Sequence, residues 1–410
     1  MATCPHINII DPEIFQGGAP HEAFAELRKQ GPLVWHEDGE LQDSGFWLVT
    51  QHKELDYISK HPDLFSSYER TCFLMENQDM GNLDLLRLMI INMDPPDHIK
   101  YRRIIRKMFT PKAINAHEDS LRQYTKDMLD RVAPKGECEF VNDIAAELPL
   151  IAICELMGIP IEDRNDFFEW TNTMIGGDDP ELSTSPEDGQ NASAMVYLYG
   201  SKLYERYSKH PEDNLVTSLI NGDVDGEALT PDEFNSFFLI LVVAGNETTR
   251  TATSHGMRLL LDHPEQLQML VDQPELIPDF IEETLRYNTA VNYFMRTATQ
   301  DAEIGGETVK KGQRVMLMYH SANHDEQVFK DPHIFDITRP QREEVKNNQR
   351  AFGIGEHFCL GTHLARLEMR LVFEEVVKRI KHPKLNGEIR YLRSNFINGI
   401  KELPLKFDAE

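Results

Sequence analysis

The sequence lacks any long run of hydrophobic residues. The longest run, residues 237–245, is far shorter than the roughly 20 apolar residues that a membrane-spanning helix needs. Residues 1–6 also lack the basic stretch and following apolar segment of a secretory signal peptide. We therefore expect a soluble, cytoplasmic protein that does not bind membranes.

Basic residues are scarce relative to acidic ones. Lys and Arg total 42 against 68 Asp and Glu, which gives a formal net charge of −26. Because nucleic-acid binding depends on a cationic surface, this excess of acid argues against nucleic acid as a partner. It also makes any local basic stretch stand out.

Cysteines are few and scattered. The 5 cysteines form no CxxC pair and are odd in number, so a disulfide framework is not expected. Cys138 and Cys154 lie among apolar residues and are expected to be small core side chains. Cys359 lies in a different, glycine-rich neighbourhood.

No internal repeat, low-complexity tract or flexible linker divides the sequence, so we expect one domain over residues 1–410. A helix over 21–30 and a strand over 45–50 are predicted near the N-terminus, and residues 96–285 are mainly helical in pattern. Strand-like patterns return over 308–318, 389–392 and 404–407. The expected fold class is mainly α with minor β.

The clearest helix begins at a capping box. Thr230, Pro231 and Glu233 occupy the cap, first and third positions, where these residue types favour a helix start. Apolar residues then recur at the spacing of one helical face: Phe234, Phe237, Phe238, Leu241 and Val242. The pattern can continue to about Leu261, before Pro264 stops it. A helix of this length is expected to cross the whole domain.

The segment around Cys359 is rich in glycine. Gly353, Gly355 and Gly361 allow the backbone to approach a flat ligand closely. Residues 362–377 are helical in pattern, so Cys359 would lie just before a helix N-terminus, where the helix dipole and free N–H groups stabilise a thiolate. Such a thiolate is a suitable ligand for iron.

Other interpretations of this segment remain at this point. Cys359 could be a buried cysteine in a glycine-rich turn that binds no ligand. A zinc site with His363 would lack two further ligands at a suitable spacing. The glycine spacing also differs from that of a dinucleotide-binding loop, and no strand–turn–helix unit surrounds it.

The same segment resembles the haem-binding signature of the cytochrome P450 family. The signature residues stand in the family's order: Phe352, Gly355, His357, Cys359 and Gly361. The resemblance implies the P450 fold, with a long central helix over haem b (iron protoporphyrin IX). It implies Cys359 as the iron ligand, with Phe352, Gly353 and Gly361 beside the haem.

A second family motif consists of Glu283 and Arg286, at i and i+3 on a predicted helix. Alone, the pair would be an ordinary surface ion pair of little energetic value. The resemblance implies that it is buried behind the cysteine loop and joined by Arg339, from the downstream stretch 329–339. We expect these three residues to have a structural role.

The long helix carries a third motif over residues 244–249. Gly245 costs about 1 kcal/mol in mid-helix, which is easier to understand if something must fit against the backbone. Thr248 lies on the same face, and its hydroxyl can bond to the preceding turn. Without the other motifs, this would be a Thr-rich piece of helix. The resemblance implies that Ala244 and Gly245 line the haem, and that Glu247 and Thr248 are catalytic and handle protons during oxygen activation.

Four basic residues are expected to hold the haem propionates. His98 and Arg102, at i and i+4 after a proline pair, place two donors on one helical face. The resemblance adds Arg296 and His357 at two further propionate-binding positions. Outside the family pattern, each of these would be an ordinary surface residue.

A basic stretch over residues 98–112 contains no acidic residue, which is conspicuous at a net charge of −26. It is either a solvated helix face or a docking surface for an acidic electron carrier, with Arg366 and Arg370 contributing from the helix after Cys359. Because the recognisable motifs span about residues 20–407, a fused reductase is not expected. Electrons would then come from a ferredoxin and its ferredoxin reductase.

The resemblance places the substrate pocket in segments 73–90, 174–177, 241–248, 290–295 and 396–397. These supply mostly apolar side chains for a hydrophobic guest: Phe73, Leu74, Met75, Leu241, Val291, Phe294 and Ile397. Asn292 and Tyr293 would orient one polar group. Residues 170–172, 243–250 and 393–401 resemble bacterial members that act on terpenoids or steroid side chains. The expected reaction is hydroxylation, in which one atom of O2 enters a C–H bond and the other becomes water.

Other functions remain open. A haem-thiolate enzyme could use peroxide, isomerise its substrate or hydroxylate fatty acids, but peroxide chemistry does not need the proton pair of Glu247 and Thr248. A non-enzymatic haem or gas-binding protein would retain Cys359 and would show no substrate-dependent change in its haem spectrum.

Overall fold

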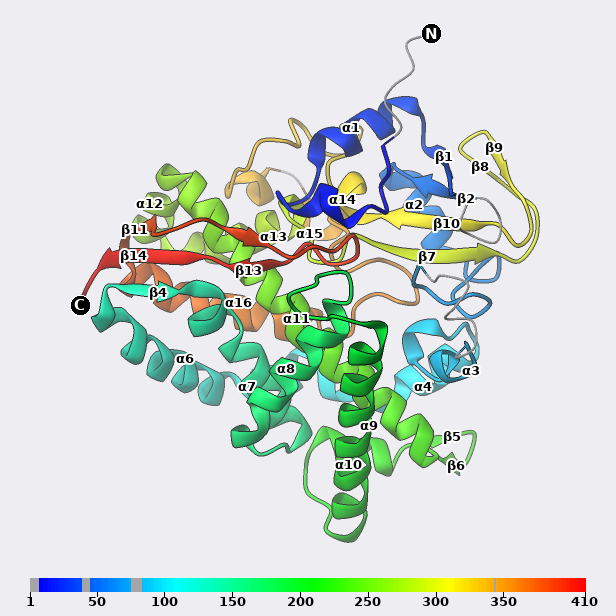
Figure 1. Ribbon diagram of the computed structural model, residues 1–410, viewed down its shortest axis with the longest axis horizontal. Helices are drawn as coiled ribbons and strands as arrows, with labels where there is room; N and C mark the ends of the chain where they lie inside the picture. The colour runs from blue at the N-terminus through cyan, green and yellow to red at the C-terminus, as the bar shows by residue number, and fades with distance from the viewer. Residues whose placement is uncertain (1–6, 39–44, 75–82, 343) are drawn as a thin grey trace.

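The computed structural model describes residues 7–38, 45–74, 83–342 and 344–410, and helices dominate it (Figure 1). Residues 1–6, where the sequence indicates no signal peptide, and the expected pocket residue Met75 lie outside these ranges. The α-helices are α1 (His21–Gln30), α2 (His52–Lys60), α3 (Leu83–Arg87), α4 (Asp97–Arg106), α5 (Pro111–Asn115), α6 (Glu118–Val132), α7 (Glu147–Met157), α8 (Arg164–Ile175), α9 (Pro186–Lys209), α10 (Leu215–Ile220), α11 (Pro231–Asp262), α12 (Pro264–Asp272), α13 (Ile277–Tyr287), α14 (Tyr319–Ala322), α15 (Val345–Asn348) and α16 (Thr362–Arg379). None of the described helices combines the length and apolar character that a membrane crossing requires.

The β-strands are short and form several small sheets. They are β1 (Leu33–Glu37), β2 (Gly45–Val49), β3 (Phe65–Ser66), β4 (Glu137–Glu139), β5 (Asp223–Val224), β6 (Glu227–Ala228), β7 (Tyr293–Ala298), β8 (Ala302–Ile304), β9 (Glu307–Val309), β10 (Arg314–Met318), β11 (Lys381–Leu385), β12 (Arg390–Tyr391), β13 (Ile400–Glu402) and β14 (Pro404–Asp408). The expected fold class, mainly α with minor β, is confirmed.

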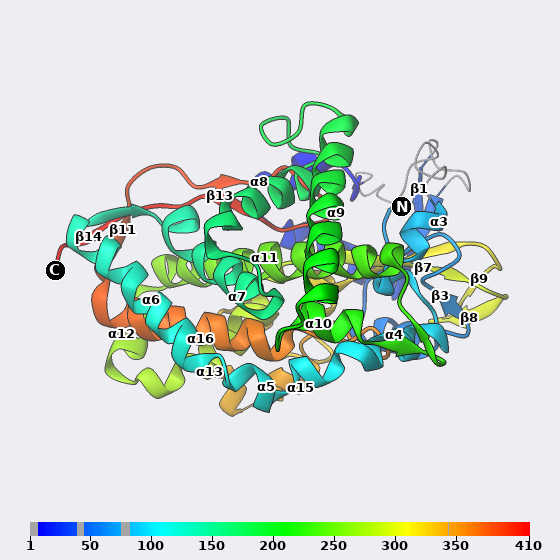
Figure 2. The same ribbon diagram turned by 90° about the horizontal axis from the view of Figure 1, so that it is seen from below.

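The central element is α11, which runs through the middle of the molecule with α9 crossing it (Figure 2). Thr230 Oγ1 accepts a hydrogen bond from Glu233 N, and the Glu233 carboxylate accepts one from Thr230 N, as the capping box predicts. The helix ends at Asp262, shortly before Pro264. Its 32 residues span about 48 Å at 1.5 Å per residue, so it also contacts α7, α8, α13 and α16.

Side chains of α11 fill the core between these helices. Phe234, Phe237 and Phe238 are all fully buried, which confirms the apolar face of the predicted helix. In the same core, Phe280 of α13 meets Phe373 of α16 edge to face, with ring centroids 4.7 Å apart. Truncation of a buried Phe to Ala typically costs about 3–5 kcal/mol. This core therefore holds α11 firmly against its neighbours.

The largest sheet joins strands from distant parts of the chain. Its order is β1-β2-β10-β7-β3, in which β10 runs parallel to β2 and the other pairs are antiparallel. Figure 1 shows it on one side of the molecule, away from α6, α7 and α10. Phe46 and Leu48 of β2 pack in one hydrophobic cluster, and Trp47 and Val49 pack in another. This alternation is typical of a strand that is covered on both faces.

Candidate active site

Cys359 lies in the loop that precedes α16. Its N–H donates to the Phe352 carbonyl over 2.9 Å, which closes the loop. Gly355 has a φ of +78°, and a Cβ there would lie 2.3 Å from the Ser59 carbonyl oxygen. Only glycine therefore lets the loop pack this closely against the end of α2.

Small residues border the Cys359 thiol. A Cβ at Gly361 would meet Cys359 Sγ at 3.9 Å, and a Cβ at Gly353 would have one neighbour, also at 3.9 Å. The Phe352 ring packs against the Arg366 guanidinium, whose Cζ lies 4.6 Å from the ring centroid. The Gly353 contact is with the Tyr319 hydroxyl, so neither glycine position is closely packed and a flat ligand could approach the loop there.

The Cys359 side chain is a free thiol near cationic groups. Burial raises its pKa, against the opposing effects of the Gly361 N–H and the guanidinium groups of Arg102 and Arg366. The Gly361 N–H acts in the direction that the sequence predicts for a position before a helix, but burial is the larger effect. A soft metal ion takes the place of the proton when a thiol becomes a ligand, so thiolate formation here is coupled to metal binding.

Four basic side chains gather beside this loop. The rings of His98 and His357 have centroids 4.2 Å apart, and Arg102 Nη2 donates to the Phe358 carbonyl. Burial, followed by nearby guanidinium groups that include Arg296, lowers the pKa of His98 to about 4 and lowers that of His357 well below its usual value. Both rings are therefore neutral at pH 7, and the two guanidinium groups carry the positive charge.

This basic cluster fits an anionic group. Within the described ranges, none of its four side chains forms an ion pair with a carboxylate. His98 Nδ1 is buried and has no hydrogen-bond partner among the described residues, and Arg296 is only 6% exposed. Because burial of an unpaired charge is costly, such a cluster requires anions. The two propionates of a haem would supply them next to the Cys359 loop.

Within the motif over residues 244–249 of α11, one side chain, that of Ala244, is exposed to solvent. Ala244 is exposed, although most of the surrounding helix is at least half-buried. Thr248 Oγ1 donates to the Ala244 carbonyl over 2.8 Å, the local bond that the sequence predicts. Close packing against the backbone at Gly245 comes from Ile153, whose Cδ1 would lie 2.6 Å from a Cβ there. The glycine lets α7 approach α11, whereas Ala244 is the small residue beside open space.

Glu247 is held in a buried ion pair that sequence reasoning missed. It is 1% exposed, it pairs with Arg250, and its Oε1 accepts a bond from Thr251 Oγ1 over 3.3 Å. Arg250 Nη1 in turn donates to Asn172 Oδ1 over 2.6 Å. The i, i+3 spacing of Glu247 and Arg250 is a signal that could have indicated the pair.

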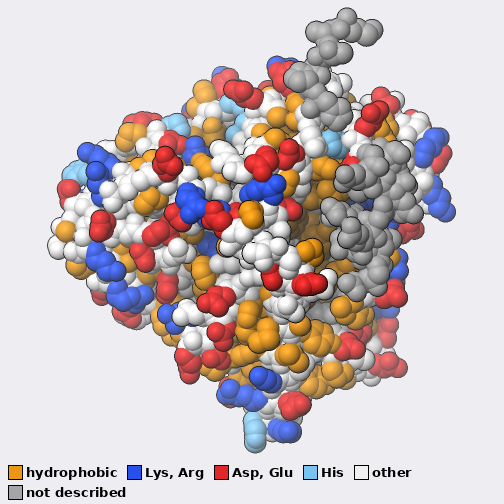
Figure 3. All heavy atoms as spheres, in the orientation of Figure 1, with side chains coloured by type: hydrophobic (Ala, Val, Ile, Leu, Met, Phe, Trp, Pro, Cys, Tyr) orange, Lys and Arg blue, Asp and Glu red, His pale blue; other side chains and the backbone are white. Residues whose placement is uncertain are grey.

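Apolar residues expected in the substrate pocket come together from distant segments. Phe73, Phe294 and Phe396 meet edge to face, with ring centroids 5.7–6.3 Å apart. Leu74 packs against the same hydrophobic cluster as Phe396, and Leu241 is partly buried against the helical core. Hydrophobic side chains also line a hollow in the face shown in Figure 3.

Asn292 and Tyr293 differ from the expectation that they orient a substrate. Asn292 Nδ2 donates to the Asn395 carbonyl over 2.8 Å, and the Tyr293 hydroxyl donates to Asn395 Oδ1 over 3.3 Å. The neighbouring Val291 forms a backbone bridge with Ile397. Both polar side chains are almost fully buried and hold the 395–397 segment in place, while Asn292 Oδ1 has no hydrogen-bond partner among the described residues, so a role in orienting a substrate stays a prediction.

Glu283, Arg286 and Arg339 form one buried network. Arg286 donates to both carboxylate oxygens of Glu283 over 2.8 Å, and Arg339 Nε donates to Glu283 Oε1 over 3.0 Å. Arg286 Nη1 also donates to the carbonyls of Asn323 and Pro332. Glu283 and Arg286 are fully buried, so the pair is not the ordinary surface ion pair that its spacing alone would indicate.

The two arginines expected to extend the basic stretch are already engaged. Arg366 binds Glu282 over 2.5 Å, and Arg370 binds Glu118 over 2.8 Å. They therefore add little free positive charge to a docking surface. The exposed cations of the basic stretch are Arg103, Arg106, Lys107 and Lys112.

Comparison with known proteins agrees with this geometry. The family model for cytochrome P450 matches residues 190–388. A steroid C26-monooxygenase of Rhodococcus jostii (strain RHA1) is 41% identical over 404 residues, which cover 97% of this chain and 84% of that protein. A linalool 8-monooxygenase of Pseudomonas putida is 34% identical and covers 96% of this chain and 97% of that one.

A solved structure shows the same likeness in three dimensions. A Mycobacterium marinum cytochrome P450 in complex with pseudoionone has a TM-score of 0.89 and 30% identity, with 99% of this chain and 100% of that chain covered. Since fold, motif and sequence identity agree over nearly its full length, this chain belongs to the cytochrome P450 family and is a haem-thiolate monooxygenase.

Proposed function

We propose that this monooxygenase hydroxylates an aliphatic carbon of a terpenoid or of a steroid side chain. The observation that carries the proposal is the pair of relatives, a steroid and a linalool monooxygenase, which align over 97% and 96% of this chain. The aromatic contact of Phe73, Phe294 and Phe396 supports it, because the rings offer apolar surface and no charge. A branched hydrocarbon fits such a wall better than a polar substrate.

The proposed cofactor is haem b, with Cys359 Sγ as the iron ligand. When bound, haem supplies the activation of O2 and the insertion of one oxygen atom into a C–H bond, while the second atom leaves as water. We propose that the guanidinium groups of Arg102 and Arg296 and the neutral rings of His98 and His357 bind its propionates. Their positions beside the thiol orient the flat group against the Cys359 loop.

We propose that Glu247 and Thr248 deliver the protons that this reaction consumes. The Thr248 hydroxyl lies one helical turn from the exposed Ala244. We propose that this side of α11 faces the haem, where the reaction would consume protons. Glu247 must first leave Arg250, since its carboxylate is held there away from solvent. Released Glu247 would take a proton from water and pass it to Thr248 Oγ1, and the closed pair would exclude water between turnovers.

Electrons are proposed to come from a ferredoxin and its ferredoxin reductase. The exposed cations Arg103, Arg106 and Lys107 lie on or next to α4, the helix that carries the propionate donors His98 and Arg102. A positive surface in a chain of net charge −26 would attract an acidic carrier to the haem side.

Substrate titration of the haem-loaded protein tests the proposed function. Linalool or a steroid with an intact side chain should shift the haem from low to high spin, and ferredoxin with O2 should give an alcohol that carries one atom of ¹⁸O2. A straight-chain fatty acid serves as the comparison substrate. Hydrogen peroxide without ferredoxin serves as the comparison oxidant. Tighter binding and faster hydroxylation of the fatty acid, or equal turnover with peroxide and no ferredoxin, would contradict the proposal.

The ligand assignment has its own test. Cys359→Ser should lose the absorption band that is characteristic of a thiolate-ligated, CO-bound ferrous haem. Cys154→Ser, at a buried cysteine elsewhere in the helical core, is the matched control and should retain it. An unchanged band in Cys359→Ser would rule out this sulfur as the ligand.

A further inference from the structure

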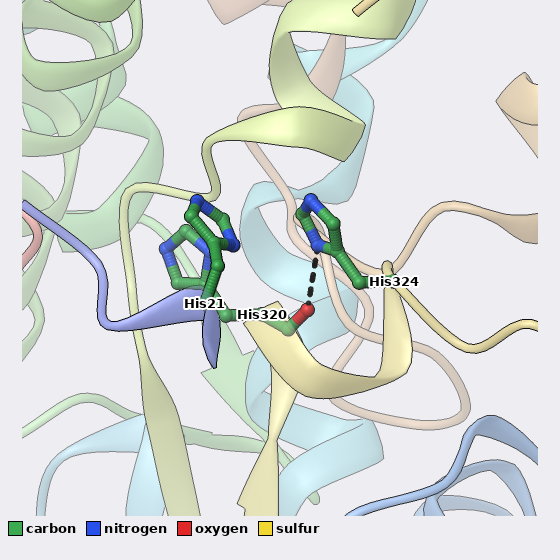
Figure 4. A group of neighbouring side chains, drawn as sticks. All are labelled: His21, His320 and His324. Atoms are coloured by element: carbon green, nitrogen blue, oxygen red, sulfur yellow. Dashed lines mark hydrogen bonds between the residues drawn. The ribbon is translucent and has the colours of Figure 1, made fainter. Parts of the chain in front are cut away.

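Three histidine rings meet where α1 contacts α14, outside the proposed haem site (Figure 4). His21 is the first residue of α1, His320 lies within α14, and His324 follows shortly after that helix. Each ring offers one nitrogen, and these nitrogens all lie within 4.8 Å of one another. The monooxygenase chemistry proposed above uses none of these residues.

Buried nitrogens in this cluster lack protein partners. His21 Nδ1, His320 Nδ1 and His324 Nε2 are buried and form no hydrogen bond of good geometry to a described residue, although the Asn288 side chain lies near His21 and the Thr289 carbonyl lies near His320. The side chains of His320 and His324 are each 1% exposed, so solvent does not satisfy them freely. Because buried polar atoms are normally paired, three orphaned nitrogens in one place indicate a missing ligand.

The hydrogen bond of the His324 ring leaves a lone pair available. His324 Nδ1 donates to the His320 carbonyl over 3.0 Å, so its Nε2 carries the lone pair (Figure 4). This backbone bond on the far nitrogen is the usual way in which proteins orient a metal-binding histidine. Asn398 Nδ2 lies 3.2 Å from His320 Nε2 and also donates to the Thr289 carbonyl over 3.4 Å, so binding of a metal ion at His320 Nδ1 requires the other tautomer of this ring.

All three rings are in the neutral form that binds metal ions. Burial is the largest cause in each case: it lowers the pKa of His21 to about 4 and those of His320 and His324 well below the usual value. Nearby positive groups, including Arg286 beside His21 and His324, act in the same direction. Arg286 is itself paired with Glu283, which limits its repulsion of a cation.

We propose that His21, His320 and His324 form a binding site for a divalent late-transition-metal ion, with zinc as the expected occupant. Three neutral imidazoles suit Zn²⁺ and its neighbours Cu²⁺ and Ni²⁺, whereas Ca²⁺ and Mg²⁺ require oxygen ligands. A water molecule would complete a tetrahedral set. The site would tie α1 to α14, where Arg28 already donates to Ser321.

The three rings need only small movements to bind such an ion. Two nitrogens bound at about 2.0–2.1 Å to one tetrahedral zinc lie about 3.4 Å apart. The rings of His21 and His324 already have centroids 4.5 Å apart, and those of His21 and His320 are 5.6 Å apart. His21 lies at the start of its helix and is only partly buried, so its side chain can rotate toward the other two.

Zinc binding by the haem-loaded, tag-free protein tests the proposal. Equilibrium dialysis against Zn²⁺, with the metal counted by mass spectrometry, should give one tightly held ion per chain. His21→Gln and His324→Gln should each weaken this binding at least tenfold. His263→Gln is the matched control, because its partly buried ring packs against Phe335 away from the cluster, and it should bind zinc as the wild type does.

The visible haem spectrum of each variant verifies that it is folded and loaded before zinc is added. X-ray absorption at the zinc edge should show imidazole nitrogens at about 2.0 Å, and this measurement on the wild type remains decisive if a variant does not fold. The proposal is wrong if the wild type holds no stoichiometric zinc, if the zinc spectrum shows no imidazole, or if both histidine variants bind zinc as tightly as His263→Gln.

Discussion

The hydroxyl of Thr248 lies on the side of α11 where Ala244 is exposed, and it donates to the Ala244 carbonyl over 2.8 Å. Thr248→Ala should therefore keep the helix and the haem but lose a group that can hold a proton there. We expect NADH consumption through the ferredoxin system to continue while product falls at least tenfold and hydrogen peroxide rises. Measurement of product and peroxide for each NADH oxidised checks this.

A neighbouring threonine provides the control for that experiment. Thr251→Ala removes another hydroxyl from α11, three residues further along and fully buried beside Glu247. Its product yield for each NADH should fall much less than that of Thr248→Ala. Tightly coupled turnover in Thr248→Ala would show that its hydroxyl has no part in proton delivery.

Glu368 is a buried carboxyl group on α16 with an unusual protonation state. Burial raises its pKa to about 8, against a smaller opposing effect of the Thr249 hydroxyl. The folded protein thus retains a proton that the unfolded chain releases above about pH 4.5. Stability should therefore fall as the pH rises from about 4.5 to 8, by up to about 1.4 kcal/mol for each pH unit.

Glu368→Gln should remove this loss, because an amide does not ionise. The unfolding temperature of the variant should exceed that of the wild type by more at pH 8 than at pH 5. Glu275→Gln changes an exposed carboxylate and should leave the pH profile as it is. Parallel profiles for wild type and Glu368→Gln would contradict the proposed protonation state.

At the scale of single residues, most contacts that the sequence analysis missed join distant parts of the chain. Cys359 and its glycines stand in one short loop, so their resemblance to the family's haem-binding signature could be recognised from that loop. The ion pair of Glu247 depends on Arg250 and on Asn172, which lies 78 positions before Arg250. Gly245 was interpreted through its own helix, while its packing partner Ile153 lies on α7.

At the scale of elements, the buried network of Glu283, Arg286 and Arg339 joins α13 to the segment that leads to the cysteine loop. Arg339→Ala would leave part of the Glu283 carboxylate uncompensated in the core. Loss of one partner from a buried pair typically costs about 3–5 kcal/mol. We expect a loss of stability of this order in chemical denaturation, together with reduced haem content.

Arg342 offers a matched control for this arginine. It is exposed, it lies close to Arg339 in the chain, and it pairs with Asp336 at the surface. Arg342→Ala should cost less than about 1 kcal/mol. Equal losses of stability in the two variants would show that burial of the network has no energetic consequence.

Element boundaries were predictable wherever the signal lies within the element. The capping box at Thr230 and the stop before Pro264 gave bounds for α11 that agree with the structure to within about a residue at each end. Sheet order could not be predicted in this way. The parallel pairing of β2 with β10 joins Trp47 to Val315, and no local pattern indicates which distant strand is the partner.

At the scale of the whole molecule, charge distribution governs encounter with an electron carrier. Arg103→Glu combined with Lys107→Glu should slow reduction by an acidic ferredoxin about tenfold at low ionic strength. The difference should shrink in high salt, because exposed charges are then screened. Stopped-flow measurement of haem reduction across a salt series checks this.

Lys126→Glu, at an exposed lysine on α6, changes the net charge in the same direction but away from α4. It should slow reduction much less than the double variant. Arg103 and Lys107 also border a surface pocket with Glu212 and Asp213. These two acids reduce the positive potential around Arg103 and Lys107. An equal rate of reduction for wild type and double variant at low salt would rule out this face for docking.

The five-stranded sheet has a consequence for how the chain is made. Its first three strands lie before residue 67, but β7 and β10, which hold them together, end at residues 298 and 318. β1 and β2 can pair with each other early, but a ribosome must complete about three quarters of the polypeptide before this pair and β3 are joined in one sheet. Because contacts between such distant residues form slowly, the nascent N-terminal segment is where a chaperone would be needed most.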